Sequence, residues 1–110
     1  MGKYRNRIEI IADILNVALV SVNKTKIMYV ANLSYRLLEK YLHEIIELDF
    51  ITFRNNSYEV TEKGRDFLER YNEFSRKYIM IDDKLRKIML EREVLKRLCE
   101  ASPQNMKKKH

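Results

Sequence analysis

The stretch KTKIMYVANLSYRLLEKYL, residues 24–42, contains two helix-like runs separated by a short break. Asn32, at the break, tolerates the left-handed backbone conformation that a tight turn requires. Ser34 can cap the N-terminus of the following helix, which we expect to start at Ser34 or Tyr35 and to end near Leu48. The pattern therefore predicts two helices joined by a turn.

The segments before and within this stretch are also helical in pattern. Upstream, apolar residues recur at helical spacing and predict an amphipathic helix over residues 4–20. The capping residues Ser21, Asn23 and Thr25 then precede KIMYVA, which predicts a second helix of about two turns. In the third helix, the apolar stripe consists of Leu38, Tyr41, Leu42 and Ile45.

A hairpin and a long helix are predicted downstream. The β-prone segments FITFR and YEV flank an Asn-Asn turn, which is typical of a short hairpin. Thr61 can cap a last helix, and Gly64 near its start would let that helix lie close to a neighbouring segment. Helix, helix, turn, helix and hairpin is the order of a winged helix-turn-helix.

The last helix meets no strong breaker before about Glu100, although Asp82 and Asp83 leave its continuity open. The fold class predicted is mainly α (α+β), a winged helix-turn-helix with a long C-terminal helix that forms a dimeric coiled coil. We expect three parts: the winged domain over residues 1–62, the dimerisation helix over 63–100 and a basic disordered tail over 101–110.

Along the last helix, mostly apolar residues recur at alternating intervals of four and three positions, which is the spacing of a coiled-coil seam. The predicted dimer interface consists of Phe67, Tyr71, Phe74, Tyr78, Ile81, Leu85, Ile88, Arg92, Leu95 and Cys99. In a parallel pair Arg92 would face its own copy, whereas in an antiparallel pair centred near Asp83 it would face the ring of Phe74. The flanking charges do not decide between the two, so the orientation stays open.

Composition narrows the classes of function. The net charge of +6 suggests a polyanionic partner, although residues 1–60 carry eight basic against seven acidic residues and are nearly neutral. With two histidines, one cysteine and no glycine-rich phosphate loop, the chain lacks the residues for an enzyme site or a structural zinc site, so we expect no metal, cofactor or small-molecule ligand.

No apolar run is long enough to cross a membrane, and we expect a cytoplasmic, chromosome-associated protein.

Three motifs carry a resemblance to a known family. The runs KTKIMYVANLSY, RLLEKYLHEIIELDFI and YEVTEKGRDFL, followed by the long last helix, resemble the small archaeal winged-helix DNA-binding proteins of the Sulfolobus 10a chromatin-protein family. The similarity covers about residues 5–74. It implies an antiparallel coiled-coil homodimer that binds double-stranded DNA with modest sequence selectivity.

A recognition helix contacts base edges with its N-terminal residues, while the wing and neighbouring helix ends contact phosphate. On this basis the predicted groove residues are Ser34, Tyr35, Arg36, Glu39 and Lys40. The predicted backbone contacts are Lys24, Thr25 and Lys26, the wing residues Arg54, Asn55 and Asn56, and the N-terminal residues Lys3, Arg5 and Arg7.

Two other functions remain compatible with the sequence. A promoter-specific transcriptional regulator would share the fold and differ in having a defined site rather than broad coverage of DNA. A winged-helix protein-interaction module would use the long helix as its partner surface and would not be retained on nonspecific DNA.

Overall fold

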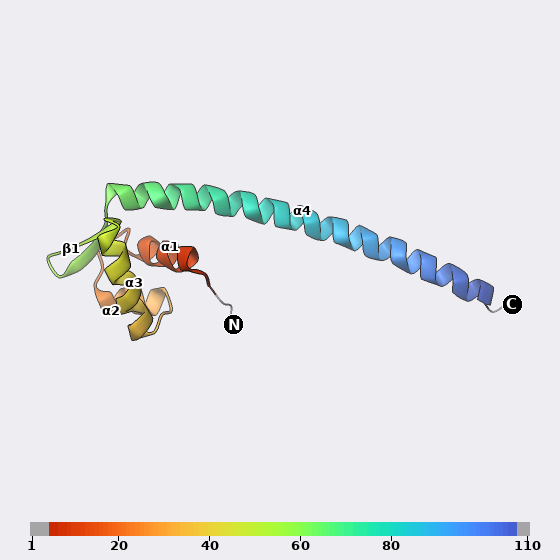
Figure 1. The fold of residues 1–110 in the computed structure, drawn as a ribbon, viewed down its shortest axis with the longest axis horizontal. Helices are drawn as coiled ribbons and strands as arrows, with labels where there is room; N and C mark the ends of the chain where they lie inside the picture. The colour runs from red at the N-terminus through yellow and green to blue at the C-terminus, as the bar shows by residue number, and fades with distance from the viewer. Residues whose placement is uncertain (1–4, 108–110) are drawn as a thin grey trace. The chain divides into compact units, whose positions relative to one another are not determined.

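The computed structural model describes residues 5–107, with side chains described for residues 5–100. The chain divides into two units, the first ending at Glu73 and the second beginning at Phe74. The elements, in order, are α1 (Arg7–Val17), α2 (Lys24–Val30), α3 (Tyr35–Glu47), β1 (Ile51–Arg54), β2 (Ser57–Val60) and α4 (Glu62–Lys107) (Figure 1).

Helix α1 is shorter than the predicted span of residues 4–20. It begins at Arg7 because Asn6 and Glu9 form a capping box, in which each side chain accepts a hydrogen bond from the other residue's backbone N–H, at 2.8 and 3.0 Å. Its buried residues are Ile10, Ile11, Ala12, Ile14 and Leu15. Apolar spacing does not reveal the capping box, so the predicted start was too early.

The turn between α2 and α3 forms as predicted. Asn23 caps α2, and the helix ends in a Schellman motif, in which the N–H of Leu33 bonds to the carbonyl of Met28 at 3.0 Å. Asn32 takes the left-handed position, with φ of 55°. Ser34 accepts a hydrogen bond from the N–H of Leu37 at 3.2 Å and so caps α3. The predicted helix-turn-helix is confirmed.

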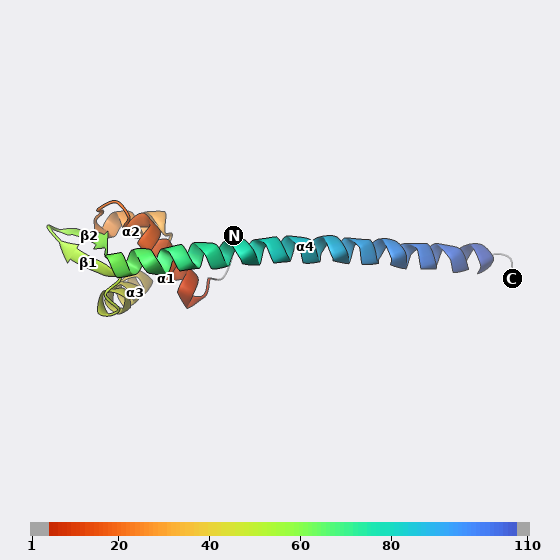
Figure 2. The ribbon, with the colours of Figure 1, turned by 90° about the horizontal axis from the view of Figure 1, so that it is seen from above.

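The hairpin also matches the prediction. Strands β1 and β2 pair antiparallel with Arg54 opposite Ser57, which leaves Asn55 and Asn56 as a two-residue loop (Figure 2). Both loop residues have positive φ, 53° and 62°, as a hairpin loop of type I′ requires. A backbone bridge between Val22 and Tyr58 joins the segment before α2 to the hairpin.

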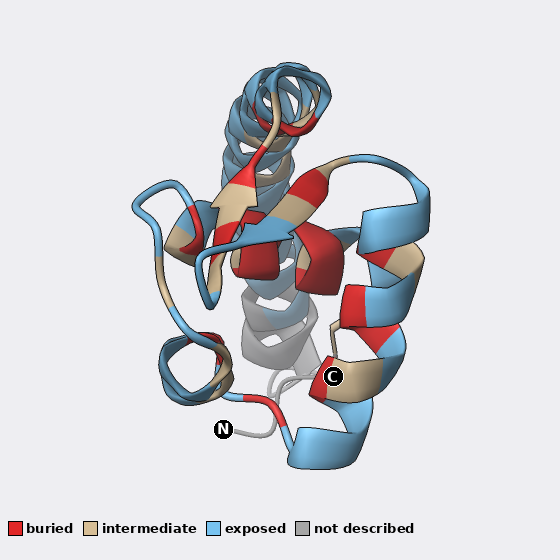
Figure 3. Ribbon diagram, turned by 90° about the vertical axis from the view of Figure 1, so that its left-hand side faces the viewer, coloured by how far each residue is buried: buried red, intermediate tan, exposed pale blue. Residues whose placement is uncertain are grey.

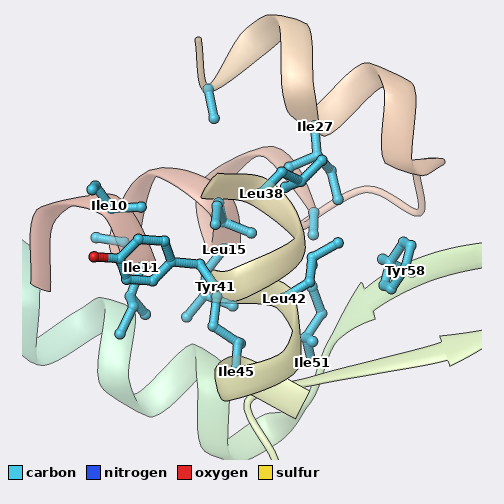
Figure 4. Packing of buried hydrophobic residues seen from close by; sticks show 14 of the residues in the cluster. Ile10, Ile11, Leu15, Ile27, Leu38, Tyr41, Leu42, Ile45, Ile51 and Tyr58 are labelled. Atoms are coloured by element: carbon cyan, nitrogen blue, oxygen red, sulfur yellow. The ribbon is translucent and has the colours of Figure 1, made fainter. Parts of the chain in front are cut away.

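The core of the first unit forms where α1, α2, α3 and the hairpin meet. In Figure 3 the buried segments lie on the inner sides of these elements. Figure 4 shows side chains of α3, including Leu38 and Ile45, pointing toward the other elements, with Leu38 beside Ile27. The predicted stripe of α3 is fully confirmed, since all four of its residues are buried.

The start of α4 is fixed to the first unit by two residues. The hydroxyl of Thr61 accepts a hydrogen bond from the N–H of Gly64 at 3.0 Å and donates one to the carbonyl of Asp49 at 2.7 Å. Gly64 is buried, and a Cβ atom at this position would lie 2.7 Å from Cγ1 of Val60 and closer still to the carbonyl oxygen of Phe50. The close approach predicted for Gly64 is therefore present.

Helix α4 runs without a break through Asp82 and Asp83. These residues form i,i+4 ion pairs with Arg86 (2.9 Å) and Lys87 (3.4 Å), which support a helix rather than interrupt it. The backbone stays helical to Lys107, beyond the predicted end near Glu100, and residues 108–110 of the predicted tail lie outside the described residues. None of the described helices has the length and apolar composition of a membrane span.

Candidate nucleic-acid interface

The leading half of α3 presents polar side chains on its exposed side. Tyr35, Arg36 and Lys40 are exposed, and Glu39 is partly exposed. Because residues four apart lie on the same face of a helix, these four side chains form two adjacent rows, Tyr35 with Glu39 and Arg36 with Lys40. The structure thus brings together the residues that were predicted to enter a groove.

Lys24, Tyr35 and Glu39 form a cluster between the start of α2 and α3. The ammonium group of Lys24 forms an ion pair with Oε2 of Glu39, and it lies 5.5 Å from the centroid of the Tyr35 ring. The hydrogen bond to Glu39 raises the pKa of Lys24, and hydrogen bonds from Lys24 and then Tyr35 lower the pKa of Glu39. Both partners are therefore charged at neutral pH.

Other cations of this surface carry no such partner. Among the ion pairs formed within residues 5–100, none involves Lys26, Arg36 or Lys40. Lys40 does lie 5.2 Å from the ring centroid of Tyr41 on its own helix. These three positive charges remain available to an anion.

The wing and the start of α2 enclose an open hollow of about 390 Å³. Its lining residues are Ser21, Val22, Asn23, Lys26, Asn55, Asn56 and Ser57. The Val22–Tyr58 bridge brings the two segments together. The predicted contacts Lys26, Asn55 and Asn56 thus share one surface, while Arg54 forms an ion pair with Glu59 at 2.9 Å on the hairpin.

Arg5 and Arg7 are used within the fold. Arg5 donates to the carboxylate of Asp13 at 2.7 Å and to the carbonyls of Ala31 and Asn32 at 2.8 and 2.9 Å. Arg7 forms an ion pair with Glu44 at 3.0 Å. In the single chain both side chains thus hold the N-terminal segment on the helix-turn-helix, whereas they were predicted to contact phosphate. Lys3 lies outside the described residues.

Some features of this surface have no signal in the sequence. The ion pair of Lys24 with Glu39 joins residues 15 positions apart on different helices, and no local pattern signals it. Ser21 and Ser57 of the hollow were overlooked as well, because their proximity depends on the Val22–Tyr58 bridge. Asn23 could be identified as a cap but not as part of a surface.

The predicted dimer interface divides between the two units. Phe67 and Tyr71 pack against the core of the first unit, and the Phe67 ring lies 5.0 Å from that of Phe50. The remaining seam residues, which belong to the second unit, are all exposed, namely Phe74, Tyr78, Ile81, Leu85, Ile88, Arg92, Leu95 and Cys99. The first two residues therefore stabilise the fold of the chain, and a seam would begin at Phe74.

The helix-turn-helix followed by a wing defines the class of the protein. The profile of the family described as winged helix-turn-helix matches residues 4–78, which is more than half of the chain, and the chain belongs to this family. Among solved structures it is similar to Sso10a-2, a DNA-binding protein from Sulfolobus solfataricus, with a TM-score of 0.67 and 27% identity over 76% of this chain and 93% of that one. The resemblance to the Sulfolobus 10a family is thereby confirmed.

Curated relatives come from Methanocaldococcus jannaschii. The uncharacterised protein MJ0290 is 37% identical over 73 residues, which cover 66% of this chain and 35% of that protein. The uncharacterised protein MJ0287 is 37% identical over 62 residues, which cover 56% of this chain and 64% of that protein. The chain thus spans less than two thirds of the length of either relative.

Proposed function

We propose that this chain is a homodimeric double-stranded DNA-binding protein of the architectural, chromatin type, with modest sequence selectivity. The observation that carries the proposal is the exposed basic leading end of α3, beside the hollow formed by the wing and α2. The similarity to Sso10a-2, which is described as a DNA-binding protein, supports it.

In the proposed complex the leading half of α3 enters the major groove. Ser34, Tyr35, Arg36, Glu39 and Lys40 would face the bases. Thr25 and Lys26 of α2 and Arg54, Asn55 and Asn56 of the wing would contact the backbone on either side, since amides, hydroxyls and cations are common phosphate ligands. Lys24 lies among these contacts but is paired with Glu39.

Sequence selectivity should be shallow in this arrangement. Arg36 is the one side chain in the leading half of α3 with the fork that matches the two acceptors of guanine. The second half of α3 carries Glu44 and Glu47, whose charges would repel phosphate. Most of the binding free energy would therefore come from phosphate contacts, which do not depend on sequence.

The second unit supports the homodimer. Its apolar side chains are largely exposed in the single chain, for example Ile81 at 66% and Leu85 at 54%, and burying them against a second copy would stabilise both helices. Arg92 favours the antiparallel arrangement, in which it lies opposite Phe74 of the partner.

Two substitutions test the DNA-binding surface. Arg36→Ala should weaken binding to duplex DNA and flatten the preference among sequences, with a cost of about 1–3 kcal/mol at a preferred site. Lys26→Ala should weaken binding uniformly and reduce the slope of log K against log salt by about one. Fluorescence anisotropy with labelled duplexes at several salt concentrations measures both quantities.

The control is Lys63→Ala, which removes one positive charge from the exposed start of α4, outside the proposed contacts. It should change neither the preference nor the salt slope. Identical preference profiles for Arg36→Ala and Lys26→Ala would exclude the groove role of Arg36. Wild-type binding that is insensitive to salt would refute the proposed function itself.

A further inference from the structure

The one carboxylate in the leading half of α3 is Glu39, and it lies among the residues proposed to face the bases. An acid on a surface that binds a polyanion is unfavourable unless it has a specific partner. We propose that Glu39 is a specificity-determining residue, which withholds Lys24 from phosphate on arbitrary sequences and accepts a hydrogen bond from the amino group of cytosine at preferred sites. This inference rests on the proposed DNA-binding function.

The geometry of the cluster allows Glu39 both roles. Lys24 donates to one carboxylate oxygen, Oε2, and the side chain of Glu39 keeps 43% of its accessible surface. A carboxylate has two oxygens with about four acceptor positions, so the bond to Lys24 does not exhaust it. Glu39 can therefore accept from a base while it remains paired with Lys24.

The two rows of α3 differ in hydrogen-bonding chemistry. The row of Arg36 and Lys40 consists only of donors, which suit guanine and phosphate. Glu39, in the neighbouring row, is kept ionised by its bonds from Lys24 and Tyr35, which lower its pKa, and it can only accept. In the major groove a carboxylate acceptor suits the N4 amino group of cytosine and is mismatched to the acceptors of guanine and thymine.

The ion pair with Glu39 also keeps the positive charge of Lys24 away from phosphate. The side chain of Lys24 is 36% exposed, and its ammonium group is held by Glu39 over the ring of Tyr35. A phosphate can gain Lys24 only by competing with a carboxylate, and it meets the repulsion of that carboxylate as it approaches. DNA of arbitrary sequence therefore lacks a phosphate contact with Lys24, although the amino-acid sequence alone would predict one.

The test is Glu39→Gln, measured on a short mixed-sequence duplex and on a randomised duplex pool from which bound molecules are selected. Glutamine keeps the size of the side chain and removes the charge. We expect binding to the mixed-sequence duplex to tighten about threefold or more, with the slope of log K against log salt steeper by about 0.9, because Lys24 becomes free to contact phosphate. The pool should lose its preference for cytosine at one position.

A double-mutant cycle separates this effect from a general change in charge. Lys24→Gln should leave the salt slope on the mixed-sequence duplex unchanged in the wild-type background and reduce it by about 0.9 in the Glu39→Gln background. The matched control is Glu47→Gln, which removes an exposed acid, itself near His43, from the far end of the same helix. It should give a smaller change and keep the base preference.

Each outcome has a clear meaning. If Glu39→Gln leaves the slope and the selected sequences unchanged, or weakens binding to all sequences alike, the role of Glu39 is disproved while the DNA-binding function stands. If the wild-type protein does not bind the mixed-sequence duplex at all, the proposed function fails first, and the two failures are therefore distinguishable.

Discussion

Gly64 is a residue at which the fold has no room for a side chain. Helix α4 approaches the chain at Phe50 and Val60 so closely that no side-chain atom fits between them. Thr61, three residues earlier, bonds both to the N–H of Gly64 and to the carbonyl of Asp49. One small residue and one hydroxyl thus fix α4 to the end of α3 and to the wing.

Gly64→Ala should destabilise the protein by about 1–3 kcal/mol, since the added methyl group overlaps backbone that cannot move independently. Urea unfolding followed by circular dichroism measures the loss. Lys63→Ala is the control, because this exposed neighbour can take alanine without a clash and should change the stability by about 0.5 kcal/mol or less. Equal stability of the two variants would show that α4 can shift away from Phe50.

At the scale of residues, the sequence predicts what depends on local backbone chemistry. Asn32, Ser34 and Gly64 each have a conformational or steric property that suits the position they occupy. The pairing of Lys24 with Glu39 depends on how two helices pack, and a single sequence contains no signal of it. The same holds for Arg5, which looks like a free cation in the sequence and is bound to backbone carbonyls in the fold.

At the scale of elements, the wing depends on its two-residue loop. Asn55 and Asn56 both have positive φ, which asparagine tolerates better than other residues with a side chain. The loop sets the register in which Arg54 lies opposite Ser57. The loop residues also line the hollow beside Lys26, so the backbone geometry of the turn determines the shape of the candidate phosphate surface.

Asn56→Gly should preserve or slightly raise stability, because glycine adopts positive φ without steric cost. Asn56→Val should lower the free energy of unfolding by about 1–2 kcal/mol, since a β-branched side chain is strained in this conformation. Thermal unfolding by circular dichroism compares the two variants. A valine variant as stable as the glycine variant would mean that the loop can adopt another turn type.

Element order and type could be predicted from the sequence, while some boundaries could not. Helix α3 and the hairpin each have a strong local signal, namely the Ser34 cap and the Asn-Asn turn. Helix α1 lacks a breaker on either side, and its start is set by a capping box whose Asn6 lay inside the predicted helix. Apolar spacing alone does not fix where such a helix begins.

At the scale of the whole molecule, the second unit exposes many large apolar side chains, which a partner could cover. Phe74, Tyr78 and Leu95 are each more than 60% exposed, and they follow the seam spacing. Ile79 and Leu90, which lie off the seam, are equally exposed. Association of two copies along the seam would cover the first set and leave part of the second accessible.

Leu85→Lys should raise the dissociation constant of the proposed dimer by about 100-fold or more, because it places an unpaired charge in the middle of the predicted seam. Sedimentation equilibrium measures the change. Leu90→Lys is the matched control, since Leu90 is similarly exposed but lies about 140° around the helix from Leu85. Dissociation by Leu90→Lys alone would place the interface on the other face.

Oxidation of Cys99 would report the orientation of the two helices in the proposed dimer. Cys99 is exposed, and a disulfide needs Cα atoms within about 7 Å. Parallel helices would place the two Cys99 side chains together, whereas an antiparallel pair centred near Asp83 would separate them by about 50 Å. We expect no cross-link within the dimer. In the sequence only Arg92 favours one orientation, because both arrangements otherwise use the same seam.

Arg5 has a consequence for how this protein should be handled. Helix α2 has no basic residue in its last turn, and the guanidinium group of Arg5 supplies the missing cation from 26 positions upstream of Ala31. Proteolytic removal of the residues before Asn6 would thus take away the positive charge at the end of α2, although the cleavage site lies outside α2. The turn between α2 and α3 would lose the hydrogen bonds from Arg5 to Ala31 and Asn32, although its own residues would all remain.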